Sequence, residues 1–179
     1  MEPVIAFKGI TPKIGKDTVI SSSAKIIGDV EIGDKCYIGP SAIIRGDLAH
    51  IVIGNHNIIE EGALIHPAEE YTDGVLTHSE VITGNYGLIG KGVIIQASYL
   101  GDYFKVCNGS IVERGAQLNE GVFVLSGSVV ANGTIVPPMS VVIGNPAHIL
   151  RKLSFGEKEK HESYVEAYYE FMKTFEPER

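Results

Sequence analysis

Eight apolar residues stand at intervals of six along the second half of the chain: Leu100, Val106, Val112, Leu118, Val124, Val130, Val136 and Val142. An α-helix favours a period near 3.6 residues and a half-buried strand a period of two, so neither explains a sustained period of six. A six-residue repeat is typical of a β-helix, in which each unit is one short strand and the corner that follows it. We therefore expect an all-β solenoid with one inward-pointing apolar side chain in each unit.

The same repeat continues upstream in shorter runs, formed by Ile27, Ile32, Ile38 and Ile44, by Ile53, Ile59 and Ile65, and by Ile89 and Ile95. A glycine often follows the apolar residue, as a chain that turns sharply after every strand requires. The repeat lapses between His66 and Glu80, where an acidic stretch with Pro67 and Gly74 predicts a loop ejected from one corner. Excursions of this kind often lie on the binding face of a solenoid.

The composition fits this fold and narrows the class of partner. Among 179 residues there are 21 glycines and no tryptophan, which suits a narrow interior. The net charge is -7 and no run of Lys and Arg occurs, so we expect neither nucleic acid nor an anionic membrane as a partner. No stretch approaches the roughly 20 apolar residues of a membrane span, and no secretory signal is visible. We expect a cytoplasmic protein in which Cys36 and Cys107 are reduced.

The pattern changes near the end of the chain. Ser154-Phe155-Gly156-Glu157 is a capping-box arrangement, and apolar residues at three- and four-residue spacing follow it: Tyr164, Val165, Tyr168, Phe171, Met172 and Phe175. We expect a helix that packs Tyr164, Tyr168, Phe171 and Phe175 against the outside of the solenoid. The β-helix then covers residues 1–152 and the helix residues 153–179. Because flat faces and an end coil remain open, we also expect a homo-oligomer.

Four segments together resemble the gamma-class carbonic anhydrases and the related ferripyochelin-binding protein-like group: Arg45-Gly46-Asp47, Asn57-Ile58-Ile59-Glu60-Glu61-Gly62, His66 and Ile143-Gly144-Asn145-Pro146-Ala147. The resemblance covers nearly the whole chain. It implies a left-handed parallel β-helix of hexapeptide repeats, a homotrimer, and a zinc ion held by three histidines at each subunit interface. It also implies that Arg45 forms an ion pair with a carboxylate of its own or the neighbouring subunit.

The zinc ligands are where the chain departs from this family. His66 matches the first histidine, whereas Lys91 and Gln96 stand at the positions of the other two. A lysine with a pKa near ~10.4 is protonated at neutral pH and offers a metal no lone pair, and a glutamine amide oxygen is a poor zinc ligand. A catalytic zinc needs three protein ligands and an open position. We therefore expect no zinc-dependent hydration of carbon dioxide.

Nearby family positions differ as well: a glutamine, an aspartate and an asparagine of the family are replaced by Glu60, Glu61 and Ile58, while Arg45 and Asp47 are kept. One interpretation is that an ion-pair cluster replaces the metal site, with Lys91 within reach of Glu60 or Asp47. Lys91 would then approach His66 across the subunit boundary. The other interpretation is that the substitutions are neutral and Lys91 reaches solvent.

Three functions stay open on this basis. The first is a non-catalytic trimeric scaffold that binds a small anion or other small molecule between Arg45 and Lys91. The second is a carbonic anhydrase with a remodelled zinc site, built from His66, His78 and a carboxylate such as Glu60. The third is a hexapeptide-repeat acyltransferase with His66 as general base, since a positioned histidine takes a proton without any metal. For a lyase or a transferase, the candidate catalytic residues are His66, Glu60, Arg45 and Asp47.

Overall fold

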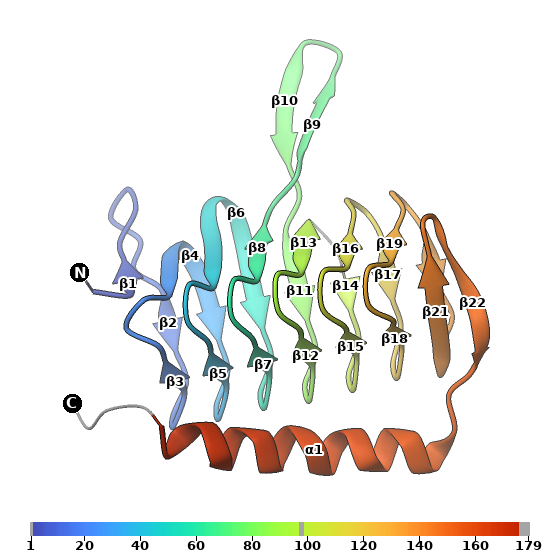
Figure 1. Cartoon of the computed structure of the whole chain (residues 1–179). Coiled ribbons are helices and arrows are strands. Elements are labelled where there is room, and N and C mark those ends of the chain that lie inside the picture. Colours follow the sequence, from blue (N-terminus) through green and yellow to red (C-terminus); the bar gives the residue numbers. More distant parts are fainter. Residues whose placement is uncertain (1, 97–98, 176–179) are drawn as a thin grey trace.

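The computed structural model describes residues 2–96 and 99–175, which form a solenoid of short strands with one long helix beside it (Figure 1). Paired strands on neighbouring coils are commonly 18 residues apart, as are Leu100, Leu118 and Val136. Since eighteen residues are three six-residue units, each coil has three sides. The chain is therefore a three-sided prism.

The elements follow one another along the chain with short corners between most of them. They are β1 (Val4–Ile5), β2 (Lys13–Ile14), β3 (Val19–Ile20), β4 (Lys25–Ile32), β5 (Tyr37–Ile38), β6 (Ile43–Ile53), β7 (Ile58–Ile59), β8 (Leu64–His66), β9 (Glu69–Thr72), β10 (Val75–His78), β11 (Val81–Thr83), β12 (Leu88–Ile89), β13 (Ile94–Gln96), β14 (Tyr99–Leu100), β15 (Lys105–Val106), β16 (Ile111–Val112), β17 (Gln117–Leu118), β18 (Phe123–Val124), β19 (Val129–Val130), β20 (Ile135–Val136), β21 (Ser140–Gly144), β22 (Ala147–Lys152) and α1 (Phe155–Lys173).

The three sides are named here by their strands. Face A contains β8, β13, β16 and β19, and face B contains β11, β14, β17 and β20. Both belong to one twelve-stranded sheet because β6 runs around the corner between them, pairing Ile43 with Leu64 and Ile51 with Val81. Face C is an eight-stranded sheet in the order β22-β21-β18-β15-β12-β7-β5-β3, and β22 pairs with β21 antiparallel at the last coil.

The six-residue positions form the core of the prism. The eight apolar residues that begin with Leu100 and end with Val142 are 0% to 3% exposed. Each stacks on its counterparts in neighbouring coils, as Ile95 does between Ile65 and Val112. The β-helix expected from the repeat is confirmed. One upstream position is wrong, because Ile26 is the buried residue and Ile27 points outward on the alternating strand β4.

Glycines permit the close stacking of corners from one coil to the next. A Cβ atom on Gly33 would lie 2.7 Å from the backbone carbonyl carbon of Gly54, closer than any real contact allows. At Gly92 the reason is conformational: its φ of +62° is in the left-handed region, which glycine adopts readily because it has no Cβ atom. The glycine corners inferred from the sequence are therefore set by both packing and backbone geometry.

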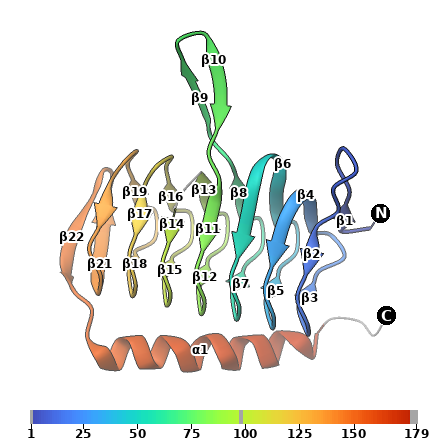
Figure 2. The same cartoon turned by 180° about the vertical axis from the view of Figure 1, so that it is seen from behind.

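The segment between His66 and Glu80 leaves the prism as expected, but it is not an irregular loop. Strands β9 and β10 pair antiparallel, with Val75 opposite Thr72 and His78 opposite Glu69. The resulting hairpin projects well beyond the solenoid at the corner between faces A and B (Figure 2). These strands were not predicted because the hairpin has no buried side, so no alternation of apolar and polar residues marks it in the sequence.

Helix α1 begins where the capping box predicted, because Ser154 is its N-cap and Glu157 completes the reciprocal hydrogen bonds. It runs along face C, parallel to the axis of the solenoid (Figures 1 and 2). Within residues 2–96 and 99–175, no helix combines the length and the apolar character that a membrane span needs.

The buried side of α1 differs from the predicted one. His161, Val165 and Tyr169 are its buried residues, and the helix packs on a row of face C side chains that includes Tyr37, Ile58 and Leu88. Tyr168 is half-buried as expected, but Tyr164, Phe171 and Phe175 are 48%, 59% and 65% exposed. A cylinder on a flat sheet buries only a narrow stripe, so Tyr164 and Phe171 lie on the flank of the helix. Phe171 contacts Phe175, which follows the end of the helix.

Candidate functional site

Face A carries two outward-pointing rows of side chains that run across the coils. The first row is aliphatic, and its half-buried members stand in register on neighbouring strands: Ile43, Leu64, Ile94, Ile111 and Val129. The second row lies two residues further along the chain and is polar from Arg45 to Glu113, with His66 directly beside Gln96. Arg45 follows Ile43 by two residues and so belongs to this polar row. The family's site residues therefore line one edge of face A.

Arg45 and Asp47 form a two-point ion pair within the chain. The Arg45 Nη2 atom lies 2.9 Å from Asp47 Oδ2, and its Nε atom lies 3.2 Å from Asp47 Oδ1. The guanidinium lowers the pKa of the Asp47 carboxyl, which is mostly shielded from solvent, and the nearby His66 lowers it further. The predicted bridge from Arg45 to a carboxylate is confirmed, and Arg45, Asp47 and His66 form one cluster.

The His66 ring is held in one orientation by its own backbone. Its Nδ1 atom lies 3.0 Å from the carbonyl oxygen of Pro67. A carbonyl oxygen can only accept a hydrogen bond, so Nδ1 carries the proton and donates it. The Nε2 atom of the neutral ring therefore keeps a lone pair, which can accept a proton or bind a metal.

Within the chain, the partner of Lys91 is Glu61 instead of the expected Glu60 or Asp47, and the approach of Lys91 to His66 across a subunit boundary stays a prediction. Its Nζ atom lies 3.1 Å from Glu61 Oε1, and both side chains are about half exposed at 51% and 58%. The two residues occupy stacked corners, where Gly92 donates a backbone hydrogen bond to the carbonyl of Glu61. Stacking makes the carboxylate on the coil below the nearest one, and the lysine faces solvent.

Glu60 has a different partner and belongs to the helix contact. The Tyr168 hydroxyl of α1 donates a hydrogen bond of 2.9 Å to Glu60 Oε1. Burial raises the pKa of Tyr168, and the hydrogen bond to the Glu60 carboxylate raises it further, so the hydroxyl keeps its proton. Glu60 therefore anchors α1 to face C, apart from the cluster of Arg45, Asp47 and His66.

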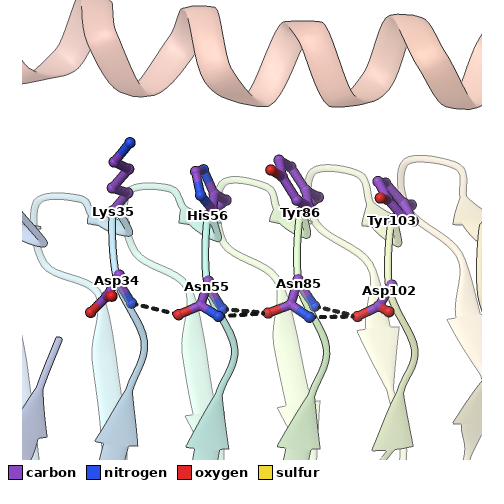
Figure 3. Close-up of a pocket in the computed structure, with 8 residues that line it drawn as sticks. All are labelled: Asp34, Lys35, Asn55, His56, Asn85, Tyr86, Asp102 and Tyr103. Atoms are coloured by element: carbon purple, nitrogen blue, oxygen red, sulfur yellow. Dashed lines mark hydrogen bonds between the residues drawn. The ribbon is translucent and has the colours of Figure 1, made fainter. Parts of the chain in front are cut away.

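A groove of about 400 Å³ at the corner between faces B and C was not singled out from the sequence. Its floor is a ladder of side-chain acceptors in which each residue binds the backbone N–H of the coil below, over 2.6–2.8 Å: Asp34, Asn55, Asn85 and Asp102. The next residue of each coil points towards α1 (Figure 3), and these four form what we call the corner row: Lys35, His56, Tyr86 and Tyr103.

The rings of the corner row stack along the solenoid axis. The centroids of His56 and Tyr86 are 4.6 Å apart with 12° between their planes, and those of Tyr86 and Tyr103 are 5.3 Å apart with 8°. Lys158 of α1 places its ammonium 4.2 Å from the Tyr103 centroid. The signal for this row is a recurring corner of glycine, an Asp or Asn, and then Lys, His or Tyr, which begins at Gly33, Gly54, Gly84 and Gly101.

Comparison with known proteins places the chain among hexapeptide-repeat proteins. The family model described as dynactin subunit 5 matches residues 8–176. The chain belongs to the dynactin subunit 5 family. Carnitine operon protein CaiE of Escherichia coli K12 is 31% identical over 152 residues, which cover 85% of this chain and 74% of CaiE.

The expected likeness to the gamma-class carbonic anhydrases is also found. Gamma carbonic anhydrase 2, a mitochondrial protein of Arabidopsis thaliana, is 30% identical over 144 residues, or 80% of this chain and 51% of the plant protein. Among solved structures, a hexapeptide transferase family protein from Anaplasma phagocytophilum is 27% identical, with a TM-score of 0.87 over 97% of this chain and 98% of that one. A proposed acetyltransferase of Bacillus cereus is 26% identical, with a TM-score of 0.86 over 96% and 95%.

The residues of this member of the dynactin subunit 5 family do not suit the zinc site that the resemblance to the gamma-class carbonic anhydrases implies. His66 is a suitable ligand, but its neighbour on the next strand is Gln96, a neutral amide. Lys91 is bound to Glu61 as an ammonium. Two of the three expected donors are therefore chemically unsuited to zinc, and we derive no reaction step through a metal.

Within the single chain, the described residues do not assemble the remodelled metal site, and the anion site between Arg45 and Lys91 stays a prediction. In the part of the chain that the structure describes, no group of three or more His, Cys, Asp or Glu side chains could hold a metal ion. Glu60 is bound to α1, and His78 lies at the base of the hairpin, 3.9 Å from Glu69. The cations Arg45 and Lys91 each have a carboxylate partner of their own.

Proposed function

We propose that this chain is a non-catalytic scaffold subunit of a larger assembly. The observation that carries the proposal is the partnering of the altered residues, since Lys91 binds Glu61 and Glu60 binds Tyr168 of the helix. A site that had lost only a ligand would leave polar groups directed at the empty position. Here the replacements contact the chain's own corner and helix. The matching family description, a subunit of dynactin, supports a role in an assembly.

Face A is the surface through which we propose that copies of the chain associate as a homotrimer. Its aliphatic row crosses five coils and is half-buried, with the Arg45–Asp47 pair and His66 along its edge. A flat apolar strip beside a polar edge has the composition of a subunit contact, with a hydrophobic core and a polar rim. Closed rings are built when one such face meets a different patch on the next copy.

Light scattering tests this association directly. We expect a particle of three times the chain's mass of 19.3 kDa at micromolar concentration. The double variant Ile94→Asp/Ile111→Asp should be monomeric with an unchanged circular dichroism spectrum, because these side chains point away from the core. Gln117→Asp, on the outer side of face B, is the matched control. A stable monomer of the unmodified chain would contradict the proposed trimer.

A second function is favoured by one feature, the orientation of His66. Its free Nε2 lone pair is the atom that a general base of an acyltransferase uses. A screen of acyl-thioester donors with hydroxyl and amine acceptors tests this function. Turnover that is lost in His66→Asn and kept in His148→Asn, whose histidine is exposed, would replace the scaffold proposal with a catalytic one.

The state of the two cysteines supports a cytoplasmic location. Both thiols are free, and burial raises the pKa of Cys36 to about 12, so its sulfur stays protonated. Free thiols persist in reducing compartments such as the cytoplasm. Imaging of the tagged full chain in its own cells should show cytoplasmic signal, and signal confined to an oxidising compartment would refute this placement.

A further inference from the structure

The residues of the corner row have an unusual backbone conformation for residues with side chains. Lys35, His56, Tyr86 and Tyr103 have φ angles of +50° to +57°, in the left-handed region that side chains disfavour. The corner between faces C and A fills the corresponding positions mostly with glycine, at φ of +62° to +69° in Gly62, Gly92, Gly109 and Gly127. Glycine would therefore satisfy the backbone at the corner row as well. Of these two corners, only the one between faces B and C carries a row of one cation and three rings at these positions.

Helix α1 supplies the opposite wall of the groove, and this wall is acidic. Glu162, Glu166 and Glu170 are four residues apart and so lie on one side of the helix. Glu166 and Glu170 line a pocket of about 190 Å³ together with Lys35 and His56. This pocket continues the groove, since the same two corner-row residues line both.

The charges along the groove are uneven. Burial, followed by the charges of Glu166 and Glu162, raises the pKa of the Tyr86 hydroxyl. At one end Lys158 is already bound to Glu120. At the other end Lys35 shares a pocket with Glu166 and Glu170. The two lysines therefore stand at the ends of the groove, and Tyr86, on which Glu162 and Glu166 act, lies between them (Figure 3).

We propose that this groove binds a basic, extended segment of a partner protein. Arginine or lysine side chains of that segment would pair with Glu162, Glu166 and Glu170 and donate hydrogen bonds to the oxygens of Tyr86 and Tyr103. Charge complementarity selects this occupant, because the carboxylate wall repels an acidic segment and the polar ladder disfavours an apolar one. Four coils at the strand spacing of about 4.8 Å extend over roughly 15 Å, the length of four or five extended residues.

This inference goes beyond the scaffold role and does not depend on it. The groove lies at the corner between faces B and C, whereas the proposed trimer contact is on face A. A monomeric chain would present the same groove, so the failure of one proposal leaves the other standing.

The test is a titration of the full chain with a blocked peptide of alternating arginine and serine, six residues long, followed by calorimetry at low and moderate salt. A peptide with glutamine in place of arginine is the control ligand. We expect saturable one-site binding of the arginine peptide that weakens with salt, and at least tenfold weaker binding of the glutamine peptide.

Two pairs of variants locate the site. Tyr86→Asn/Tyr103→Asn removes the rings but keeps a residue type that tolerates the left-handed conformation, and Tyr71→Asn, on the hairpin at 74% exposure, is its control. Glu162→Gln/Glu166→Gln removes the wall charges, and Glu159→Gln, exposed on the first half of α1, is its control. We expect each double variant to lose at least tenfold in affinity while the controls stay within twofold.

Several results would overturn the proposal. They are the absence of saturable binding at millimolar peptide, equal binding of the glutamine peptide, or affinities that the two double variants do not change. Melting curves accompany each variant. If the tyrosine double variant unfolds, Tyr86→Phe/Tyr103→Phe replaces it, which keeps the rings and removes the hydroxyls. If the glutamate double variant unfolds, Glu166→Gln replaces it. Unchanged affinity in both replacements would also overturn the proposal.

Discussion

The six-residue repeat makes a quantitative prediction for stability, in which one substitution is compared at two positions. Ile95 is 0% exposed and stacks between Ile65 and Val112, whereas Ile135 on face B is 65% exposed. Truncating Ile95 to alanine removes three carbon groups, worth about 0.8 kcal/mol each. The cavity left in a packed coil brings the loss to about 3–4 kcal/mol. Ile135→Ala removes the same atoms from a mostly solvated site and should change stability by less than about 1 kcal/mol.

Thermal and urea unfolding followed by circular dichroism measure this difference. For a chain of this length, about 2–4 °C of melting temperature corresponds to 1 kcal/mol, so Ile95→Ala should melt about 6–16 °C below the unmodified chain. Ile135→Ala should melt within about 3 °C of it. Equal losses at the two positions would refute the assignment of the repeat to the core.

Three further predictions concern the helix, the pH response and the altered site. Val165→Asp places a charge on the fully buried side of α1 and should detach it, so hydrogen exchange of residues 155–173 should become fast; Glu159→Asp is the control. Arg151 and Ser154 lower the pKa of Glu157 to about 2. Its stabilising contribution is thus complete above its unfolded pKa near ~4.3 and is lost as pH falls towards 2, where helix signal should decrease; Glu157→Gln should abolish that pH dependence. Lys91→His/Gln96→His should create zinc affinity measurable by calorimetry, and Lys91→His alone should not.

Much of the fold was predictable because it rests on a local signal repeated many times. Each coil places one apolar residue inward, so a single misassigned position such as Ile27 does not disturb the rest. The left-handedness of the β-helix was expected only from the family resemblance. The exposed side of α1 was not predictable. Tyr164, Val165 and Phe171 are all apolar, and the sequence does not say which of them contacts the flat sheet, which can bury only a narrow side of the helix.

The site was predictable only where its residues are neighbours in sequence. Arg45 and Asp47 are two residues apart, and their pairing followed from the retained motif. Glu60 was misplaced because its partner Tyr168 lies 108 residues away and arrives with the helix. The corner row was missed for a related reason: its members are 21, 30 and 17 residues apart. The long strand β6 lies in the first interval and the hairpin in the second, so the row follows no fixed period.

The metal content of the purified chain tests the central claim most directly. The protein is produced in medium supplemented with zinc and purified without chelators. Its zinc content is measured by elemental mass spectrometry, and its rate of carbon dioxide hydration is measured on the same sample. The scaffold proposal predicts far less than one zinc per chain and a hydration rate at background, because Lys91 and Gln96 cannot replace histidine ligands. One zinc per chain that is lost in His66→Ala would contradict it.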